Sequence, residues 1–290
     1  MIGCVNGSDR GGRRRGMRDA RPFSLGRGRR PSAMRILLAL LITMMAMPAE
    51  SAQCSAQSGP QTVALVELYT SEGCDSCPPA DRWLSGLGRR GLAPDRVVPL
   101  SLHVDYWDYI GWKDAYAKRE FSSRQRKLTQ LQRNAFVYTP QVMLQGRDYR
   151  EWATRAFEEK LARINAQPAK AGLSLQIIAL TKTTMSVHVQ AQLLDVEHKQ
   201  DAALYLASYE NKLASQVSSG ENRGQTLEHD YVVLEWQGPF DFGAGPHLQE
   251  QRVLPLLPKA VPGNSGAVAF VQNRRNLEVL QALMLPACGG

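Results

Sequence analysis

Two cysteines, Cys74 and Cys77, are the residues of this chain whose types and spacing most clearly point to chemistry. A short apolar run at 63–69 precedes them and is typical of a buried strand. Prolines at 78–79 follow, and proline is tolerated in the first turn of a helix because its missing N–H would be unpaired there. The sequence therefore predicts a dithiol at the start of a helix that begins at Ser76 or Cys77.

Such a position favours redox chemistry of the sulfurs. The thiolate is the reactive form of cysteine, and the unpaired N–H groups and dipole of a helix N-terminus stabilise it. We expect Cys74, nearer the loop, to be the more exposed sulfur and the nucleophile, and Cys77 to resolve the mixed disulfide. The alternatives are an inert structural disulfide and half of a zinc site, although Cys54 and Cys288 do not form the second close pair that a zinc ribbon needs.

The basic charge of the chain lies outside its expected folded part. The formal net charge is +8, and residues 1–35 hold ten arginines against two aspartates. The rest of the chain is therefore neutral, which argues against nucleic acid as a partner. We expect the Arg-rich run to be disordered.

An uncharged, mostly apolar run at 36–47 follows the basic segment. It is shorter than the roughly 20 residues that a membrane span needs, but it suits the apolar region of a signal peptide. We therefore interpret 1–52 as a basic leader plus signal peptide, with Met34 as the true start. The mature protein would be periplasmic or secreted, without a stable membrane span.

Export would place the remaining cysteines where disulfides persist. Once Cys74 and Cys77 are considered as a pair, Cys54 and Cys288 are left, one near each end of the mature chain. A disulfide between them would tie those ends together. The alternative is two free terminal thiols.

The order of elements predicts an α/β fold followed by a β-rich one. Residues 60–168 favour the order β-α-β-α-β-β-α, in which residues 105–114 form an aromatic loop. From about Gly172 to 288, short β-like runs separated by turn residues suggest a mostly antiparallel, β-sandwich-like second domain. We place the boundary at 167–172.

The strand, the dithiol, the helix and the later Thr139-Pro140 together resemble the thioredoxin superfamily. More narrowly, several segments resemble DUF1223, a family of bacterial secreted proteins of unknown function. The matching segments are 66–81, 103–112, 138–141, 220–222 and 229–233.

The thioredoxin resemblance implies roles for three more residues. It implies that Pro140 is a cis-proline facing the dithiol and that Thr139 contacts a bound peptide. It also implies a buried acid on the strand before the dithiol that moves protons at the second thiol. Glu67 is the nearest acid, but its register is one residue off, and a one-residue shift turns a strand side chain to the opposite face. Gly73 stands where thioredoxins usually carry a tryptophan.

His103 lies at the end of the second expected strand, at the sheet edge that also carries the dithiol. We weigh it as a hydrogen-bonded structural histidine and, alternatively, as a third ligand beside Cys74 and Cys77 for Cu(I), which soft thiolates and imidazole suit. We expect no cofactor otherwise.

These observations leave three hypotheses. The first is a thiol-disulfide oxidoreductase that acts through Cys74 and Cys77 on exported protein thiols or a redox partner. The second is a periplasmic copper-binding protein that uses the same sulfurs and His103. The third is a non-catalytic, partner-binding protein with a structural disulfide.

Overall fold

The computed structural model describes residues 54–134 and 136–288. The first part follows the predicted order β-α-β-α-β-β-α. Its elements are β2 (Ala64–Thr70), α1 (Pro78–Ser85), β3 (Val97–His103), α2 (Arg119–Leu131), β4 (Gln141–Leu144), β5 (Arg147–Asp148) and α3 (Arg155–Asn165). Short 3-10 helices, η1 (Gly88–Arg90) and η2 (Asp105–Ile110), add to these, and η2 occupies the aromatic segment that was expected to be a loop.

The second part is built of strands, as predicted. They are β6 (Ala171–Leu180), β7 (Thr184–Leu193), β8 (Ala202–Glu210), β9 (Leu213–Gln216), β10 (Thr226–His229), β11 (Val232–Asp241), β12 (His247–Pro255), β13 (Ser265–Asn273) and β14 (Val279–Pro286). Two short 3-10 helices, η3 (Val196–His198) and η4 (Pro262–Asn264), connect them. The sequence did not predict β9, β10 or the first strand, β1 (Cys54–Gln57), because runs of four residues carry little periodic signal.

Both parts contribute to one mixed sheet. Its eight strands run in the order β14-β13-β8-β11-β3-β2-β4-β5. Strand β3 is parallel to β2 on one side and to β11 on the other, and Ser101 N donates to Tyr231 O at 2.8 Å. The boundary expected at 167–172 is therefore a change in strand content within one compact unit, because β3 and β11 share a hydrogen-bonded edge.

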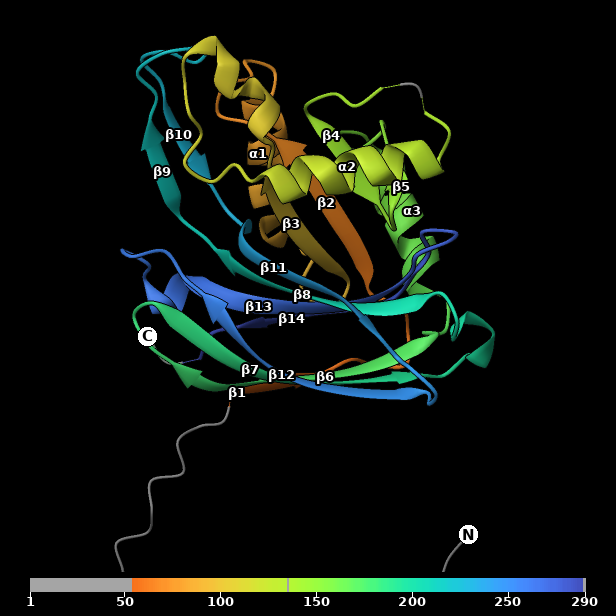
Figure 1. Cartoon of the computed structure of the whole chain (residues 1–290). Helices are drawn as coiled ribbons and strands as arrows, with labels where there is room; N and C mark the ends of the chain where they lie inside the picture. The colour runs from red at the N-terminus through yellow and green to blue at the C-terminus, as the bar shows by residue number, and fades with distance from the viewer. Residues whose placement is uncertain (1–53, 135, 289–290) are drawn as a thin grey trace, which may run out of the picture. The chain divides into compact units, whose positions relative to one another are not determined.

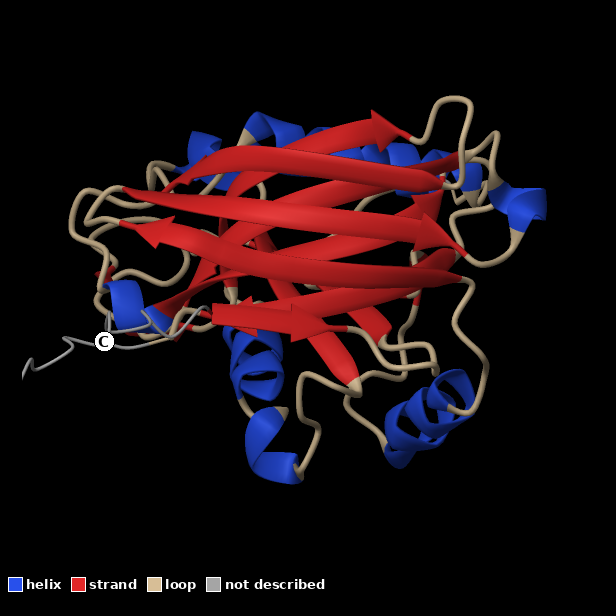
Figure 2. Ribbon diagram, turned by 90° about the horizontal axis from the view of Figure 1, so that it is seen from below, coloured by secondary structure: helices blue, strands red, loops and turns tan. Residues whose placement is uncertain are grey.

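The core lies on both faces of this sheet. A four-stranded antiparallel sheet, β1-β6-β7-β12, covers one face at the β8–β13 end, and Figure 2 looks onto it from below. Helices α1 and α3 cover the same face at the β2–β4 end, while α2 packs on the opposite face. Strand β8 shows why: Leu204 and Leu206 join the core between the sheets, and Tyr205 and Ala207 join the core under α2.

A disulfide joins the two ends of the described chain. Cys54 and Cys288 are bonded, with their Cα atoms 5.5 Å apart, as the sequence analysis allowed. Cys54 lies on β1, which pairs antiparallel with β6 from Cys54 opposite Ile177. The bond therefore fixes the end of the chain to the outer edge of the four-stranded sheet.

The expected leader and signal peptide at 1–52, with the start at Met34, lie outside the described residues. Within the part of the chain that the structure describes, no helix is both long and apolar enough to cross a membrane.

Candidate functional site

The dithiol lies between β2 and α1, as predicted. Cys77 is the N-cap residue of α1, and its N–H donates to the carbonyl oxygen of Cys74 at 3.3 Å. The two cysteines are joined as a disulfide, with their Cα atoms 5.4 Å apart. The spacing of two residues thus brings the sulfurs together at the N-terminus of α1, where Pro78 and Pro79 carry no N–H and the next two N–H groups donate to Cys77 O.

The exposure expected for Cys74 was wrong. Cys74 is 1% exposed and Cys77 is 0% exposed, so burial does not distinguish the two. The sequence analysis placed Cys74 at an open loop edge because it considered only the neighbouring residues. A segment almost 150 residues later in the chain binds the backbone of the dithiol loop.

That segment is the cover loop, residues 217–225, which joins β9 to β10. Asn222 is buried, and its Nδ2 donates to the carbonyl oxygens of Glu72 and Cys74, each at 2.9 Å. The Glu221 carboxylate accepts a hydrogen bond from Asp75 N at 3.0 Å. In Figure 1, β9 and β10 extend from the large sheet alongside α1, which carries the cover loop to the dithiol.

The aromatic segment 105–112 closes the remaining side. A Cβ atom placed on Gly73 would lie 3.3 Å from both Ile110 Cδ1 and Trp107 Cβ, so η2 occupies the space that a larger residue would need. Gly220 of the cover loop has φ +77°, and a Cβ atom there would lie 3.2 Å from Ile110 Cδ1. Both glycines therefore allow the cover loop, η2 and the dithiol loop to pack closely.

Thr139 and Pro140 lie at the same end of the sheet as the dithiol. Their peptide bond is cis, as predicted, and it leads into β4, which pairs antiparallel with β2 so that Gln141 lies opposite Tyr69. Trp107 Nε1 donates to Thr139 Oγ1 at 2.7 Å. Trp107 thus packs beside the dithiol loop with its Cβ atom and binds the cis-proline segment with its ring nitrogen.

Glu67 does not have the position of a proton carrier for the dithiol. Its neighbours Val66 and Leu68 pack toward α1, so Glu67 points to the opposite face, under α2. There it forms a buried ion pair with Arg124, with Oε1 2.6 Å from Nε, and also accepts a hydrogen bond from Tyr69. The expected catalytic role is corrected to a structural one, and the one-residue register offset is the reason.

His103, at the end of β3, belongs to a buried ion pair. Its Nδ1 lies 2.7 Å from Asp114 Oδ2, and both side chains are fully buried. Burial alone would lower the pKa of His103, but the Asp114 carboxylate outweighs it and raises the pKa to about 9. His103 also draws the pKa of Asp114 below its ordinary value, against the effect of burial. A cationic imidazole is therefore fixed beside the dithiol loop, because Asp114 also accepts from Glu72 N.

Three more buried ionisable residues adjoin this pair. His229, the last residue of β10, has Nε2 3.3 Å from Glu72 Oε1 and Nδ1 4.0 Å from Asp81 Oδ2. The rings of His229 and His103 stand nearly perpendicular, with centroids 4.9 Å apart. Burial raises the pKa of Asp81 above its ordinary value, although His229 and His103 act in the opposite direction. The site therefore combines a dithiol with three buried acids and two buried imidazoles.

The arrangement does not provide the copper site considered above. Across residues 54–134 and 136–288, no three His, Cys, Asp or Glu side chains are grouped to hold a metal ion. The sulfurs of Cys74 and Cys77 are bonded to each other, and Asp114 engages His103 Nδ1. The donor set of the metal hypothesis does not fit a metal centre in this geometry.

Glu72, Asp81, Asn222 and His229 lie in the segments that resemble DUF1223, but no role was expected for them from the sequence. Asn222 and His229 follow the dithiol by about 150 residues, so no local pattern relates them to it. One feature of the sequence could have identified them as site residues. They are polar residues in the matching segments, at positions where neither a strand nor a turn requires a polar side chain.

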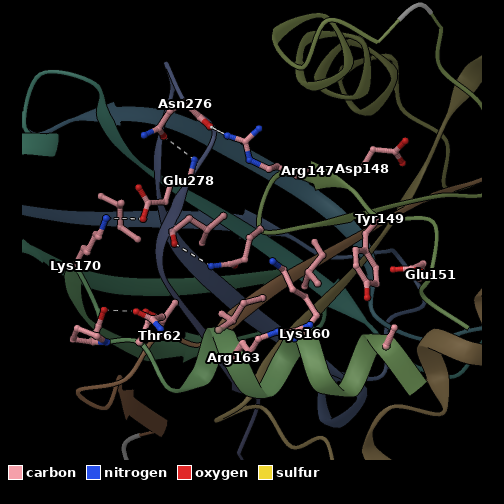
Figure 3. A pocket seen from close by; sticks show the side chains of 18 residues that line it. Thr62, Arg147, Asp148, Tyr149, Glu151, Lys160, Arg163, Lys170, Asn276 and Glu278 are labelled. Atoms are coloured by element: carbon pink, nitrogen blue, oxygen red, sulfur yellow. Dashed lines mark hydrogen bonds and ion pairs between the residues drawn. The ribbon is translucent and has the colours of Figure 1, made fainter. Parts of the chain in front are cut away.

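A larger cavity of about 790 Å³ lies elsewhere, between α3, the β4–β5 turn and the start of β14 (Figure 3). Lys170 and Glu278 form an ion pair of 2.7 Å across it, and Arg147 donates to the carbonyl oxygen of Asn276. The residues that line this cavity include none of the dithiol site. Its charged groups join the two parts of the chain, and we assign it no chemistry.

Comparison with known proteins supports this description of the fold. Residues 65–272 match the profile of a family described as "Protein of unknown function (DUF1223)". Protein AGR_C_4864 of Agrobacterium tumefaciens, the structural genomics target AtR35, has a similar structure with a TM-score of 0.58. It is 24% identical, and the match covers 80% of this chain and 98% of that one.

HBP35 of Porphyromonas gingivalis is also similar in structure, with a TM-score of 0.59 and 15% identity. That match covers 78% of this chain and 76% of the other. At such low identity these structures support the fold alone. No curated protein matched the chain.

Proposed function

Since the chain belongs to the DUF1223 family, whose function is unknown, we propose from the site itself that it is a thioredoxin-like thiol-disulfide oxidoreductase. Cys74 and Cys77 would exchange disulfides with the thiols of exported proteins or with a redox partner. The observation that carries this proposal is the Cys74–Cys77 disulfide at the N-terminus of α1, directly after a strand of the mixed sheet.

The surroundings of the dithiol support the proposal. The order of elements from β2 to α3, with β3 parallel and β4 antiparallel to β2, is that expected of a thioredoxin-like unit. The cis peptide bond between Thr139 and Pro140 leads into β4, at the end of β2 from which the dithiol loop departs. A peptide that reached this place would contact both the dithiol and the cis-proline segment.

Burial of Cys74 adds a condition to this function. A substrate sulfur must approach Cys74 Sγ along the axis of the bond that breaks, and a residue that is 1% exposed leaves no room for it. We propose that the cover loop moves away from the dithiol loop during exchange. Its hydrogen bonds from Asn222 and to Glu221 are then the contacts that open.

The same burial favours a second candidate, a structural disulfide in a partner-binding protein. Structural disulfides are shielded and resist reduction by the glutathione pool, whereas catalytic ones are more accessible and more easily reduced. The two candidates therefore differ in whether the native protein exchanges Cys74–Cys77 with an external thiol.

Export is part of the proposal. Two disulfides, Cys54–Cys288 and Cys74–Cys77, suit an oxidising compartment such as the periplasm or the exterior of the cell. A cytosolic protein would seldom keep a disulfide that joins its two ends.

The test is to trap the mixed disulfide. Cys77→Ser removes the resolving sulfur, so Cys74 should form a stable mixed disulfide with a disulfide-bonded peptide, mapped by mass spectrometry. Cys74→Ser is the matched control and should trap little, because we propose Cys74 as the nucleophile and Cys77, the N-cap residue of α1, as the resolving cysteine. Absence of any adduct on folded Cys77→Ser would favour the structural disulfide.

A further inference from the structure

The exchange proposed above needs a proton acceptor at the second cysteine. Cys77 has to lose its proton before its sulfur can attack the mixed disulfide, because the thiolate is the nucleophile. Cys77 is fully buried, so bulk water does not reach it directly. Glu67, the acid expected from the sequence, points to the other face of the sheet and is paired with Arg124.

Asp81 lies on α1, the helix that begins at the dithiol, whereas Glu67 points to the opposite face of the sheet. It lies one helical turn after Cys77, and Asp81 N donates to Cys77 O at 3.1 Å. Residues four apart on a helix share a face, so the two side chains project to the same side of α1. Asp81 is 6% exposed, and its Oδ1 has no hydrogen-bond partner among the residues that the structure describes. A buried carboxyl oxygen without a partner costs free energy, and a catalytic role is one reason why a protein keeps such a group.

Charged and polar groups surround Asp81 from each neighbouring element. His229 approaches it from β10, with Nδ1 4.0 Å from Oδ2, and His103 acts on it from β3. Asp114 and Glu72 are the acids of the same cluster. Arg82, the next residue of α1, is exposed. The carboxyl group thus lies beside an imidazole, and no arginine or lysine among residues 54–134 and 136–288 forms an ion pair with it.

A path to solvent begins at Asp81. A cavity of about 140 Å³ is lined by Asp81 and His229 at its inner end and by exposed residues of α1 and β10, including Arg82 and Glu228. This volume is enough for a few water molecules, which need roughly 30 Å³ each. A proton on Asp81 can therefore leave without opening the cover loop over Cys74.

We propose that Asp81 is the proton acceptor for Cys77, with His229 as the residue that positions it and the small cavity as its route to water. This inference rests on the proposed exchange function. Burial also brings the pKa of Asp81 nearer to that of a thiol, which favours proton transfer between them.

The reaction balances as follows. The Cys74 thiolate attacks a substrate disulfide, so a Cys74–substrate bond forms and one substrate sulfur leaves as a thiolate. Cys77 gives its proton to Asp81, and its sulfur attacks Cys74 Sγ. The Cys74–Cys77 bond forms, the second substrate thiolate leaves, and Asp81 releases the proton to water. Two electrons pass from the protein dithiol to the substrate, and the reverse sequence oxidises a substrate dithiol.

The experiment separates the two steps. Reduced full-length protein is mixed with glutathione disulfide at pH 6 to 9, quenched with acid and analysed by mass spectrometry. Asp81→Asn should leave formation of the Cys74 mixed disulfide unchanged and slow its resolution by about 10²-fold near pH 6.5, the size typical of lost acid–base catalysis. At pH 9 the rate should recover, because Cys77 then ionises without help. Circular dichroism of the variant at pH 6.5 and pH 9 verifies that it is folded.

Controls identify which idea fails. Asp81→Glu should restore most of the resolution rate, and Glu159→Gln, at an exposed position of α3, should behave as wild type. If Asp81→Asn does not fold, His229→Gln should slow the same step and not the first. Wild type that forms no mixed disulfide would overturn the exchange function and this inference together. Wild type that turns over, with normal resolution at pH 6.5 in Asp81→Asn, would overturn this inference alone.

Discussion

Asn222 donates a hydrogen bond of 2.9 Å to the carbonyl oxygen of Cys74, 148 residues earlier in the chain. The same Nδ2 donates to the carbonyl oxygen of Glu72, so one buried amide binds both ends of the segment 72–74. The cover loop that carries Asn222 therefore controls access to the dithiol.

Asn222→Ala should open this cover. Losing the amide leaves the Glu72 carbonyl without a donor and Cys74 O with Cys77 N alone, which costs about 1–3 kcal/mol. Because reduction of a buried disulfide passes through the open state, dithiothreitol should reduce Cys74–Cys77 about tenfold faster, as expected for a shift of about 1.4 kcal/mol. The measurement is the rate of reduction followed by alkylation and mass mapping.

The matched control is Gln216→Ala, which removes a hydrogen bond to Thr226 between the exposed faces of β9 and β10. It should leave the reduction rate at the wild-type value. An Asn222→Ala protein that is reduced no faster than wild type would show that the cover loop does not limit access.

The His103–Asp114 pair predicts how stability depends on pH. The pKa of His103 is raised to about 9 from an unfolded value near 6.5, so its contribution is complete below about pH 6.5 and is lost as pH rises through about 9. The pKa of Asp114 is lowered, so its contribution is present above about pH 4 and is lost as pH falls further. Urea unfolding of the oxidised protein should show stability falling between pH 6.5 and 9.

Asp114→Asn should remove that fall. The variant should also lose about 3 kcal/mol at pH 6, because breaking a buried ion pair leaves one partner uncompensated. Arg252→Gln, which breaks a surface pair with Glu250, is the control and should cost less than about 1 kcal/mol. A wild-type profile that stays level from pH 6.5 to 9 would contradict the assigned charge of His103.

Glu67→Gln should affect stability and not chemistry. Glu67 is fully buried against Arg124, whose guanidinium also stacks 4.6 Å from the Trp236 ring. Removing the carboxylate should cost about 3 kcal/mol, because Arg124 loses its main counter-ion. The rates of both exchange steps should match wild type after folding is verified. A slowed resolution step with unchanged stability would restore the role expected from the sequence.

The Cys54–Cys288 disulfide should stabilise the fold without taking part in exchange. It closes a loop with a sequence separation of 234 residues, and a disulfide that closes so long a loop is expected to contribute more than about 4 kcal/mol. The double variant Cys54→Ser/Cys288→Ser should lose roughly that stability in urea unfolding while keeping the exchange rate of Cys74. Loss of exchange in a folded double variant would show that the two disulfides are coupled.

The sequence predicted the local parts of the site well. The pattern of an apolar run, a dithiol and a proline pair was enough to place β2, the cysteines and α1. The cis bond before Pro140 followed from the resemblance, and the pairing of Cys54 with Cys288 followed from the small number of cysteines. Each of these depends on neighbouring residues, on the resemblance or on simple counting.

The parts that were missed depend on distant segments. Asn222 binds the carbonyl oxygen of Cys74, and His229 lies beside Asp81, although no periodicity relates either residue to α1. The two expected domains share one sheet because β11 lies against β3, a pairing between residues more than 100 positions apart. For Glu67, the strand register visible in the sequence predicted the correct face of the sheet. The general expectation of an acid near the dithiol did not.

The reduction potential of Cys74–Cys77 in the native full-length protein tests the central proposal most directly. The protein is equilibrated in glutathione and dithiothreitol buffers, quenched, alkylated and mapped while Cys54–Cys288 serves as an internal reference. We predict reversible exchange at Cys74–Cys77, with a potential between about −300 and −120 mV, the range of exchanging dithiols. A disulfide that stays oxidised in buffers well below about −300 mV until the protein unfolds would contradict the oxidoreductase function and identify Cys74–Cys77 as structural.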